Sequence, residues 1–240
     1  MPEWLKTVLR PVYFRVDHWR GNPGFEFHHL PIVDIVHEYD AVYSYILDAG
    51  DAPDFTAGQY AHVIAPGAIR DNHHVRHMSF ANAPHEAGVL FSMDCASASR
   101  FKRRFRKARP GDIVRLFKIR GDFTLRDEEA GRPVLFIAGG IGIAPIRSLI
   151  AQMDADGRRN WALVYAGRGI LYRDFWAQFP DQVAFADRQT VFPKVATALT
   201  ALDRPLVYLC GQDAFIADTT AFLTGQGIAP ADIRTENFSH

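Results

Sequence analysis

The second half of the chain takes its fold from the residues Val134-Leu135-Phe136-Ile137-Ala138-Gly139-Gly140-Ile141-Gly142-Ile143-Ala144-Pro145. The first five are apolar and typical of a buried strand, and a helical pattern runs from Pro145 to Met153. The glycines between them let the backbone approach a diphosphate closely, and the free N–H groups at a helix start attract an anion. Proline suits the first helical turn, so we expect the helix to begin at Pro145. The spacing is not the G-x-G-x-x-G fingerprint, which leaves a ligand-free glycine turn as the alternative.

Short apolar strands alternate with helical stretches through the rest of this half. The predicted strands are Trp161–Ala166, Val183–Ala186 and Leu206–Cys210, and each precedes a helical pattern. Such alternation is typical of a parallel sheet with crossover helices. We therefore predict an α/β parallel-sheet domain over residues 132–240.

The first half has a different pattern, with short strand-like runs separated by turn clusters. The predicted strands are Leu30–His37, Ala41–Leu47, Gln59–Ala65, Val89–Met93 and Asp112–Ile119, and one helix interrupts them at Ser99–Ala108. Regularly spaced strands of this kind favour an antiparallel β-barrel, which we place at residues 29–127. Residues 1–28 form an N-terminal extension, and the polar segment from Asp127 to Arg132 is the expected linker.

Composition excludes several classes of protein. The chain has 240 residues, with 27 Lys and Arg against 27 Asp and Glu, and its two cysteines are Cys95 and Cys210. Two thiols cannot supply the four ligands of a structural zinc or iron–sulfur site. A zero formal charge argues against a dedicated nucleic-acid binder. No run reaches the roughly 18 apolar residues that span a bilayer, and the start of the chain lacks a signal-peptide core, so we expect a cytoplasmic protein without stable membrane association.

A second motif is Arg76-His77-Met78-Ser79 in a strand-like stretch of the first half. An arginine can bind a phosphate through two N–H groups, and the serine can hydrogen-bond a nitrogen of a bound heterocycle. A surface arginine and a strand serine without a ligand are the alternative.

Taken in order, the motifs resemble those of the ferredoxin–NADP reductase superfamily. The resemblance covers about Leu30 to Phe238 and rests on seven segments: Phe55–Tyr60, Arg76–Ser79, Gly121–Leu125, Gly139–Pro145, Tyr165–Arg168, Cys210-Gly211 and Glu236–Phe238. The chain departs from the family pattern at Met78, where the R-x-Y-S motif has an aromatic residue, and at Gln212, where C-G-P has proline. The Gly-Pro that usually precedes G-x-F is replaced by Ile119-Arg120.

The resemblance implies a two-domain flavoprotein that transfers hydride between a nicotinamide nucleotide and FAD. Its catalytic residues would be Ser79 near flavin N5, Cys210 beside the nicotinamide, and Glu236. Flavin contacts would come from Arg76, His77, Met78, Ser79, Ser97, Ser99 and Phe238. Phe238 would stack on the flavin and move aside for nicotinamide; a sheet-edge core residue is the alternative for it. Two phosphate anchors, Arg76 and the helix start after Ser99, favour FAD over FMN.

The nicotinamide nucleotide would contact Gly139, Gly140, Gly142, Pro145, Arg168, Arg173 and Gly211. Many NAD-specific enzymes place an acidic residue on the adenosine ribose. The segment between Ala166 and Tyr172 has no acidic residue, whereas Arg168 and Arg173 could bind a 2′-phosphate. NADPH is therefore favoured over NADH.

The predicted helix of the first domain has seven basic residues among ten, from Arg100 to Arg109. Phe101, Phe105 and Ala108 share one face, which leaves a cationic surface suited to a small acidic ferredoxin or flavodoxin. A solvated helix face is the alternative. The acceptor is also open: the chain could be the reductase component of an oxygenase, a free-flavin or ferric reductase, or a non-catalytic electron-transfer subunit.

Five of the ten histidines are candidate metal ligands in the first half of the chain. They are His29, His37, His73, His74 and His77, and none pairs at helical ligand spacing with a third ligand. We interpret them as polar loop residues and predict no metal site.

Overall fold

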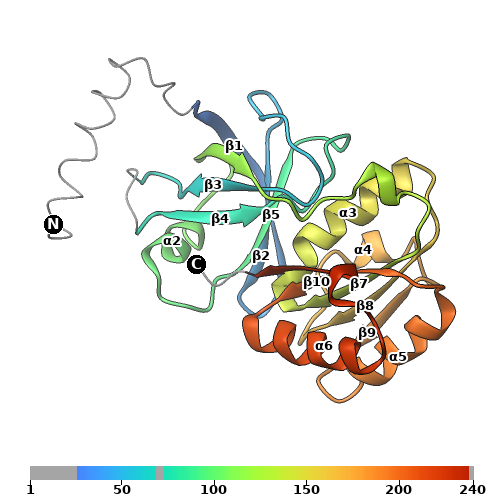
Figure 1. Ribbon diagram of the computed structural model, residues 1–240. Coiled ribbons are helices and arrows are strands. Elements are labelled where there is room, and N and C mark those ends of the chain that lie inside the picture. The colour runs from blue at the N-terminus through green and yellow to red at the C-terminus, as the bar shows by residue number, and fades with distance from the viewer. Residues whose placement is uncertain (1–25, 69–72, 238–240) are drawn as a thin grey trace, which may run out of the picture.

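The computed structural model describes residues 26–68 and 73–237, which form two domains side by side (Figure 1). An antiparallel sheet occupies the N-terminal domain, and a parallel sheet flanked by helices occupies the C-terminal one. The predicted extension at residues 1–28 lies outside the described residues apart from its last three. The fold class predicted from the sequence is confirmed, while the predicted domain boundaries stay a prediction.

Six antiparallel strands build the first domain. They are β1 (His28–Tyr39), β2 (Val42–Leu47), β3 (Tyr60–Ile64), β4 (Val75–Ser79), β5 (Val89–Asp94) and β6 (Ile113–Arg120), in the spatial order β4-β3-β6-β1-β2-β5. Just beyond β4, the N–H of Ala81 donates to the carbonyl of Leu90 in β5 at 2.9 Å. The two edge strands of the sheet therefore meet, as in the predicted barrel.

The helix α2 (Arg100–Phe105) covers one end of the barrel core. Phe101 and Phe105 are buried, and the Phe105 ring meets the buried Tyr45 edge-on at a centroid distance of 4.9 Å. The helix is shorter than the predicted Ser99–Ala108. The N–H groups of Lys107 and Ala108 bond to carbonyls three residues back, so the chain tightens into a turn before Pro110, which disfavours helix at the residue before it.

Five parallel strands build the second domain. They are β7 (Val134–Gly139), β8 (Trp161–Ala166), β9 (Val183–Ala186), β10 (Leu206–Gly211) and β11 (Ile233–Asn237), in the order β11-β10-β7-β8-β9. The predicted linker includes a 3₁₀ turn, η1 (Asp127–Glu129). Strand β11 was not predicted, because Ile-Arg-Thr-Glu-Asn lies at the edge of the sheet and lacks the apolar run of a central strand.

Helices cover both faces of the parallel sheet. They are α3 (Ile143–Ala155), α4 (Arg173–Trp176), α5 (Val191–Ala201) and α6 (Asp213–Gly225). Successive residues of β7 point to opposite faces: Phe136 packs in the core that includes α3, and Leu135 in the core that includes α5 and α6. A short 3₁₀ turn, η3 (Pro230–Asp232), leads into β11. In the described part of the chain, no helix is long and apolar enough to cross a membrane.

The α3 side of the sheet faces the barrel, as Figure 1 shows. Its core continues into the first domain through Val42, Ala57, Ala81 and Phe123, which pack in the same buried cluster as the apolar residues of α3. The ends of β4, β10 and β11 consequently approach one another where the domains meet, and the candidate site lies there.

Candidate active site

The turn after β7 lies directly against the carboxyl end of β10. It is a 3₁₀ turn, η2 (Gly140–Gly142), that continues into α3. A Cβ atom on Gly142 would lie 2.4 Å from the carbonyl oxygen of Cys210, which no side chain can tolerate without a backbone shift. The predicted strand–turn–helix unit is confirmed, and glycine at 142 has a steric reason as well as the predicted role at a phosphate.

The helix begins two residues earlier than the sequence predicted. Its first residue is Ile143, so Pro145 is the third residue of α3 and does not start it. The reason is that the 3₁₀ turn η2 ends at Gly142 and the α-helix begins at the next residue, with no extended residue between them. Proline is still accommodated, because the N–H groups of the first turn have no acceptor within the helix.

Cys210 and Glu236 are brought together by strand register. They are directly paired on the parallel strands β10 and β11. Cys210 has no exposed surface, and burial raises the pKa of its thiol well above the ordinary value, with the negative charge of Glu236 raising it further. The thiol is therefore neutral at physiological pH, and its surroundings disfavour a thiolate.

A cleft of about 600 Å³ lies between the two domains. Its lining residues come from the barrel and from β11: Tyr60, Arg120, Gly121, Asp122, Thr235, Glu236 and Asn237. Ser79, the last residue of β4, is 7% exposed and pairs directly with Tyr60. Of the predicted catalytic residues, Glu236 thus lines the cleft. Ser79 and Cys210 lie on the neighbouring strands, Ser79 paired with Tyr60 and Cys210 paired with Glu236.

The predicted flavin anchors gather at the other end of β4. The guanidinium carbon of Arg76 lies 5.9 Å from the ring centroid of Phe101, in the first turn of α2. Ser99 caps this helix, and its hydroxyl accepts the N–H of Lys102 at 3.2 Å. A cation beside the first turn of a helix fits the phosphate groups of a flavin nucleotide. Ser97 is exposed in the segment before the cap, and Phe238 lies outside the described residues.

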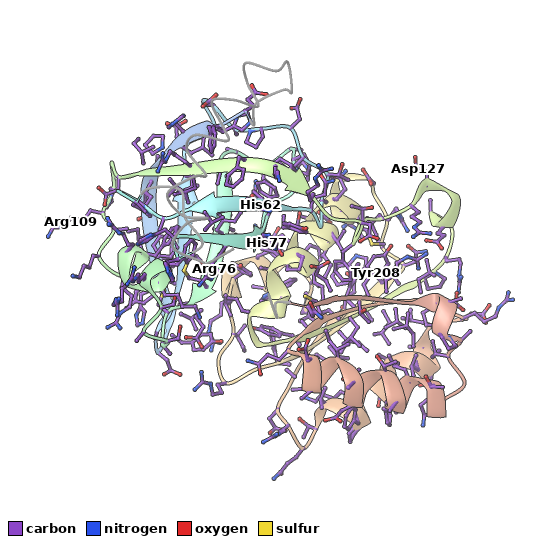
Figure 2. All side chains as sticks on the ribbon, turned by 60° about the vertical axis from the view of Figure 1, so that its left-hand side comes forward. His62, Arg76, His77, Arg109, Asp127 and Tyr208 are labelled. Atoms are coloured by element: carbon purple, nitrogen blue, oxygen red, sulfur yellow. The ribbon has the colours of Figure 1, made fainter. Side chains whose placement is uncertain are left out.

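His77 faces a histidine that the sequence prediction did not single out. Strand register places it opposite His62, with 2.9 Å between the two Nε2 atoms, and the ring of Tyr60 stacks on His77 at a centroid distance of 4.9 Å. Figure 2 shows His62 and His77 together on neighbouring strands. Met78, on the opposite side of β4, packs against the barrel core. Among residues 26–68 and 73–237, no three His, Cys, Asp or Glu side chains converge as metal ligands.

The two arginines predicted for a 2′-phosphate lie on the segment between β8 and α4. Arg168 is 75% exposed and lies 3.6 Å from a carboxylate oxygen of Asp94, at the end of β5. Arg173 is the exposed first residue of α4. The structure thus places both on the segment after β8, and Arg168 reaches across to the barrel domain.

Comparisons with known proteins agree with this architecture. The chain is 27% identical over 214 residues to the terephthalate 1,2-dioxygenase reductase component 2 of a Comamonas species, an alignment that covers 80% of this chain and 62% of that protein. The chain thus spans about three fifths of the length of such relatives. No family model matches the sequence.

Two solved structures share the fold. Phthalate dioxygenase reductase superposes with a TM-score of 0.74 at 24% identity, over 89% of this chain and 68% of that one. A ferredoxin–NADP⁺ reductase from Neisseria gonorrhoeae with bound FAD and NADP superposes with a TM-score of 0.73 at 18% identity, over 88% of this chain and 98% of that one. The predicted resemblance to the ferredoxin–NADP reductase superfamily is confirmed by these relatives and neighbours.

The close approach at Gly142 yields a first prediction. Gly142→Ala should lower the free energy of unfolding by about 1–3 kcal/mol, because the added methyl group displaces the end of β10. Gly131→Ala is the matched control, since a Cβ there meets no atom within 4 Å. Urea unfolding of both variants gives the measurement. Equal stability of the two variants would show that the backbones do not approach as closely as described.

Proposed function

We propose that the protein is a flavoprotein oxidoreductase that transfers hydride between NAD(P)H and FAD and passes single electrons to a separate carrier. The observation that supports this most directly is the cleft, which Glu236 lines from the sheet and Tyr60, the pairing partner of Ser79, lines from the barrel. A site shared by both domains is what a reaction between a flavin and a nicotinamide requires.

Each of the three catalytic residues has a distinct role in the proposed reaction. Bound FAD supplies the chemistry that links two-electron hydride transfer to one-electron delivery. Ser79 donates a hydrogen bond beside flavin N5 and orients the ring. Cys210 offers the nicotinamide a neutral, polarisable contact, and its raised pKa keeps the thiol proton in place. Glu236 holds a negative charge beside Cys210 and lines the cleft from the parallel sheet.

In this proposal the electron acceptor is a carrier outside these 240 residues. Both cysteines of the sequence are buried, and two thiols cannot hold an iron–sulfur cluster. The names of the relatives, which include reductase components of terephthalate and propane oxygenases, favour an oxygenase system as the consumer of the electrons. A ferredoxin or flavodoxin fits the same reaction. Free-flavin or ferric reduction and a non-catalytic role remain as outcomes of the test below.

The reaction is tested on the purified protein by flavin extraction and anaerobic stopped-flow. We expect FAD as the extracted flavin, bleaching by NADPH or NADH, and reoxidation by a neutral quinone. Ser79→Ala should slow bleaching on the order of 100-fold while FAD stays bound. Thr200→Ala, which removes an exposed hydroxyl from α5, is the control. FMN as the sole flavin would refute the cofactor, and a wild-type protein that neither coenzyme bleaches would refute the activity.

NADPH is the proposed coenzyme. Support comes from Arg168 and Arg173 on the segment after β8, where the sequence between Ala166 and Tyr172 has no acidic residue. The exposed guanidinium of Arg168 is available to a 2′-phosphate. Its ion pair with Asp94, at 3.6 Å, is too long and too exposed to fix the arginine side chain.

The coenzyme preference is measured as the ratio of kcat/KM for NADPH and NADH. The double variant Arg168→Gln, Arg173→Gln should lose about tenfold or more of kcat/KM for NADPH and little for NADH. Arg204→Gln, a change at an 89% exposed arginine remote from β8, is the control. A wild-type protein that prefers NADH would contradict the assignment.

The carrier is proposed to dock on the basic patch, defined as Arg100, Lys102, Arg103, Arg104, Arg106, Lys107 and Arg109. Phe101 and Phe105 face the core as predicted, which directs the charged residues of α2 outward. Arg104 is fixed by donation to the carbonyl of Gly67 at 2.8 Å. Arg103 and Lys107 are both exposed; Arg103 lies in α2, and Lys107 lies in the turn that follows the helix. Such a surface steers short-lived encounters with an acidic protein.

Charge reversal at the exposed pair tests the docking surface. Arg103→Glu with Lys107→Glu should slow reduction of an acidic [2Fe–2S] ferredoxin about tenfold at low salt, with the difference shrinking as salt is added. Reduction of a neutral quinone should stay within twofold of the wild-type rate. Arg204→Glu is the matched control. An equal effect on both acceptors would remove the docking proposal.

A further inference from the structure

Arg147 crosses from the second domain to the first. It is the fifth residue of α3, and its side chain is 11% exposed. Its Nη1 donates to Oε2 of Glu86 at 2.9 Å, and its Nη2 donates to Oε1 at 2.8 Å. The same Nη1 also donates to the carbonyl of Ala81 at 2.8 Å. A charge buried this deeply needs hydrogen-bond acceptors, and the barrel supplies them for Nη1 and Nη2, while the buried Nε has none among the described residues.

The acceptors belong to the segment that directly follows Ser79. Ala81 is two residues after it, and Glu86 lies in the loop between β4 and β5. The carboxylate of Glu86 also accepts the N–H of Ala83 at 2.6 Å. Burial raises the pKa of Glu86, but the bonds and charge of Arg147 outweigh burial and hold the pKa below its usual value. Glu86 is therefore an anion at physiological pH and forms an ion pair with Arg147.

A neighbouring pair reinforces the contact. The hydroxyl of Ser148 donates to the carbonyl of Asn82 at 2.6 Å, and the side chain of Asn82 binds the backbone of both Gly88 and Leu90. The segment from residue 81 to residue 90 is thus tied to itself and to α3. A displacement of α3 would carry the end of β4 with it.

The guanidinium also rests on α4. Its carbon lies 4.2 Å from the ring centroid of Phe175 and 5.5 Å from that of Tyr172. The Tyr172 hydroxyl in turn donates to Ser92 of β5 at 2.6 Å. A lysine could not combine a two-pronged bond to a carboxylate with stacking on a ring, so the geometry is specific to arginine.

We propose that Arg147 is a positioning residue for hydride transfer, because it fixes α3 to the chain segment that carries Ser79. This inference rests on the proposed function. The glycine turn at the start of α3 lies against Cys210 on the nicotinamide side, and Ser79 lies on the flavin side. Arg147 links Cys210 to Ser79 through α3 and the segment that follows β4. It therefore sets the separation between these two residues.

Hydride transfer is sensitive to such a separation. The reacting atoms must come within about 3–3.5 Å, and a displacement of about 1 Å can cost about 100-fold in rate. Substitution of Arg147 by lysine keeps a positive charge but loses the second bond and the ring contact. The expected result is a slower transfer step with coenzyme binding largely retained.

The test is anaerobic stopped-flow of the FAD-loaded full chain at saturating coenzyme. Arg147→Lys should lower the rate constant of flavin bleaching at least tenfold and leave the KM for coenzyme within about threefold. Glu86→Gln should lower this rate constant less, because the amide oxygen can keep one of the two hydrogen bonds between Arg147 and residue 86. Arg159→Lys is the control, because this exposed arginine lies in the segment after α3 and pairs with Asp154. Electron delivery from dithionite-reduced protein to a neutral quinone should not change in any variant.

The readouts separate positioning from folding. A fold defect reduces the amplitude of bleaching, which reports the intact fraction, whereas misplacement reduces the rate constant at full amplitude. If Arg147→Lys fails to fold, Glu86→Gln carries the test. A wild-type rate constant in the folded variant would overturn the inference, while a wild-type protein that no coenzyme bleaches would overturn the proposed function itself.

Discussion

The close passage of the β7–α3 turn against the end of β10 is the constraint on which the site depends. Because Gly142 leaves no room for a side chain, the helix start and the Cys210 backbone form one rigid edge of the sheet. Parallel pairing then places Glu236 beside Cys210 and extends this edge into the cleft. The glycine turn therefore permits the close approach of the two backbones, and this approach fixes Cys210 and Glu236 relative to the start of α3.

The second constraint is the polar interface between the domains. Apolar packing alone permits one surface to slide over another, whereas a buried charge with few acceptors has one satisfied position. Arg147 is held in that way, and Tyr172, Ser92 and Ser44 form a second hydrogen-bonded chain that ends at Glu38. Both chains begin on the α3–α4 side of the parallel sheet and end on the barrel. The relative placement of the two domains is thus set by hydrogen-bond geometry as much as by buried area.

Local sequence pattern predicted most of the fold because the decisive signals are local. Apolar alternation located the strands to within a few residues, and the glycine turn located the start of the second domain's site. The predictions failed where residues outside the local pattern determine the structure. The helix α2 ends early ahead of Pro110, and β11 is a polar edge strand that is ordered by pairing with β10. Arg147 with Glu86, and His62 with His77, were not predicted, because 61 and 15 residues separate their members and only the tertiary fold brings them together. Ser79, Cys210 and Glu236 were predicted only through family motifs, since each is unremarkable in its own stretch of sequence, and their catalytic roles stay a prediction.

The protonation of Cys210 links this architecture to the chemistry. A thiol at a strand end near a helix start is often activated, because the helix dipole and nearby cations favour the thiolate. Here complete burial and the adjacent Glu236 oppose ionisation and raise the pKa. Burial and the adjacent carboxylate of Glu236 therefore keep the cysteine neutral, so the thiol is not activated as a nucleophile. In the proposed reaction, a neutral thiol beside an anion would suit a site that accepts a nicotinamide in both its charged oxidised form and its uncharged reduced form. In that reaction, the electrostatic preference between the two forms would come from Glu236, whose charge would stabilise the oxidised ring and so favour hydride donation.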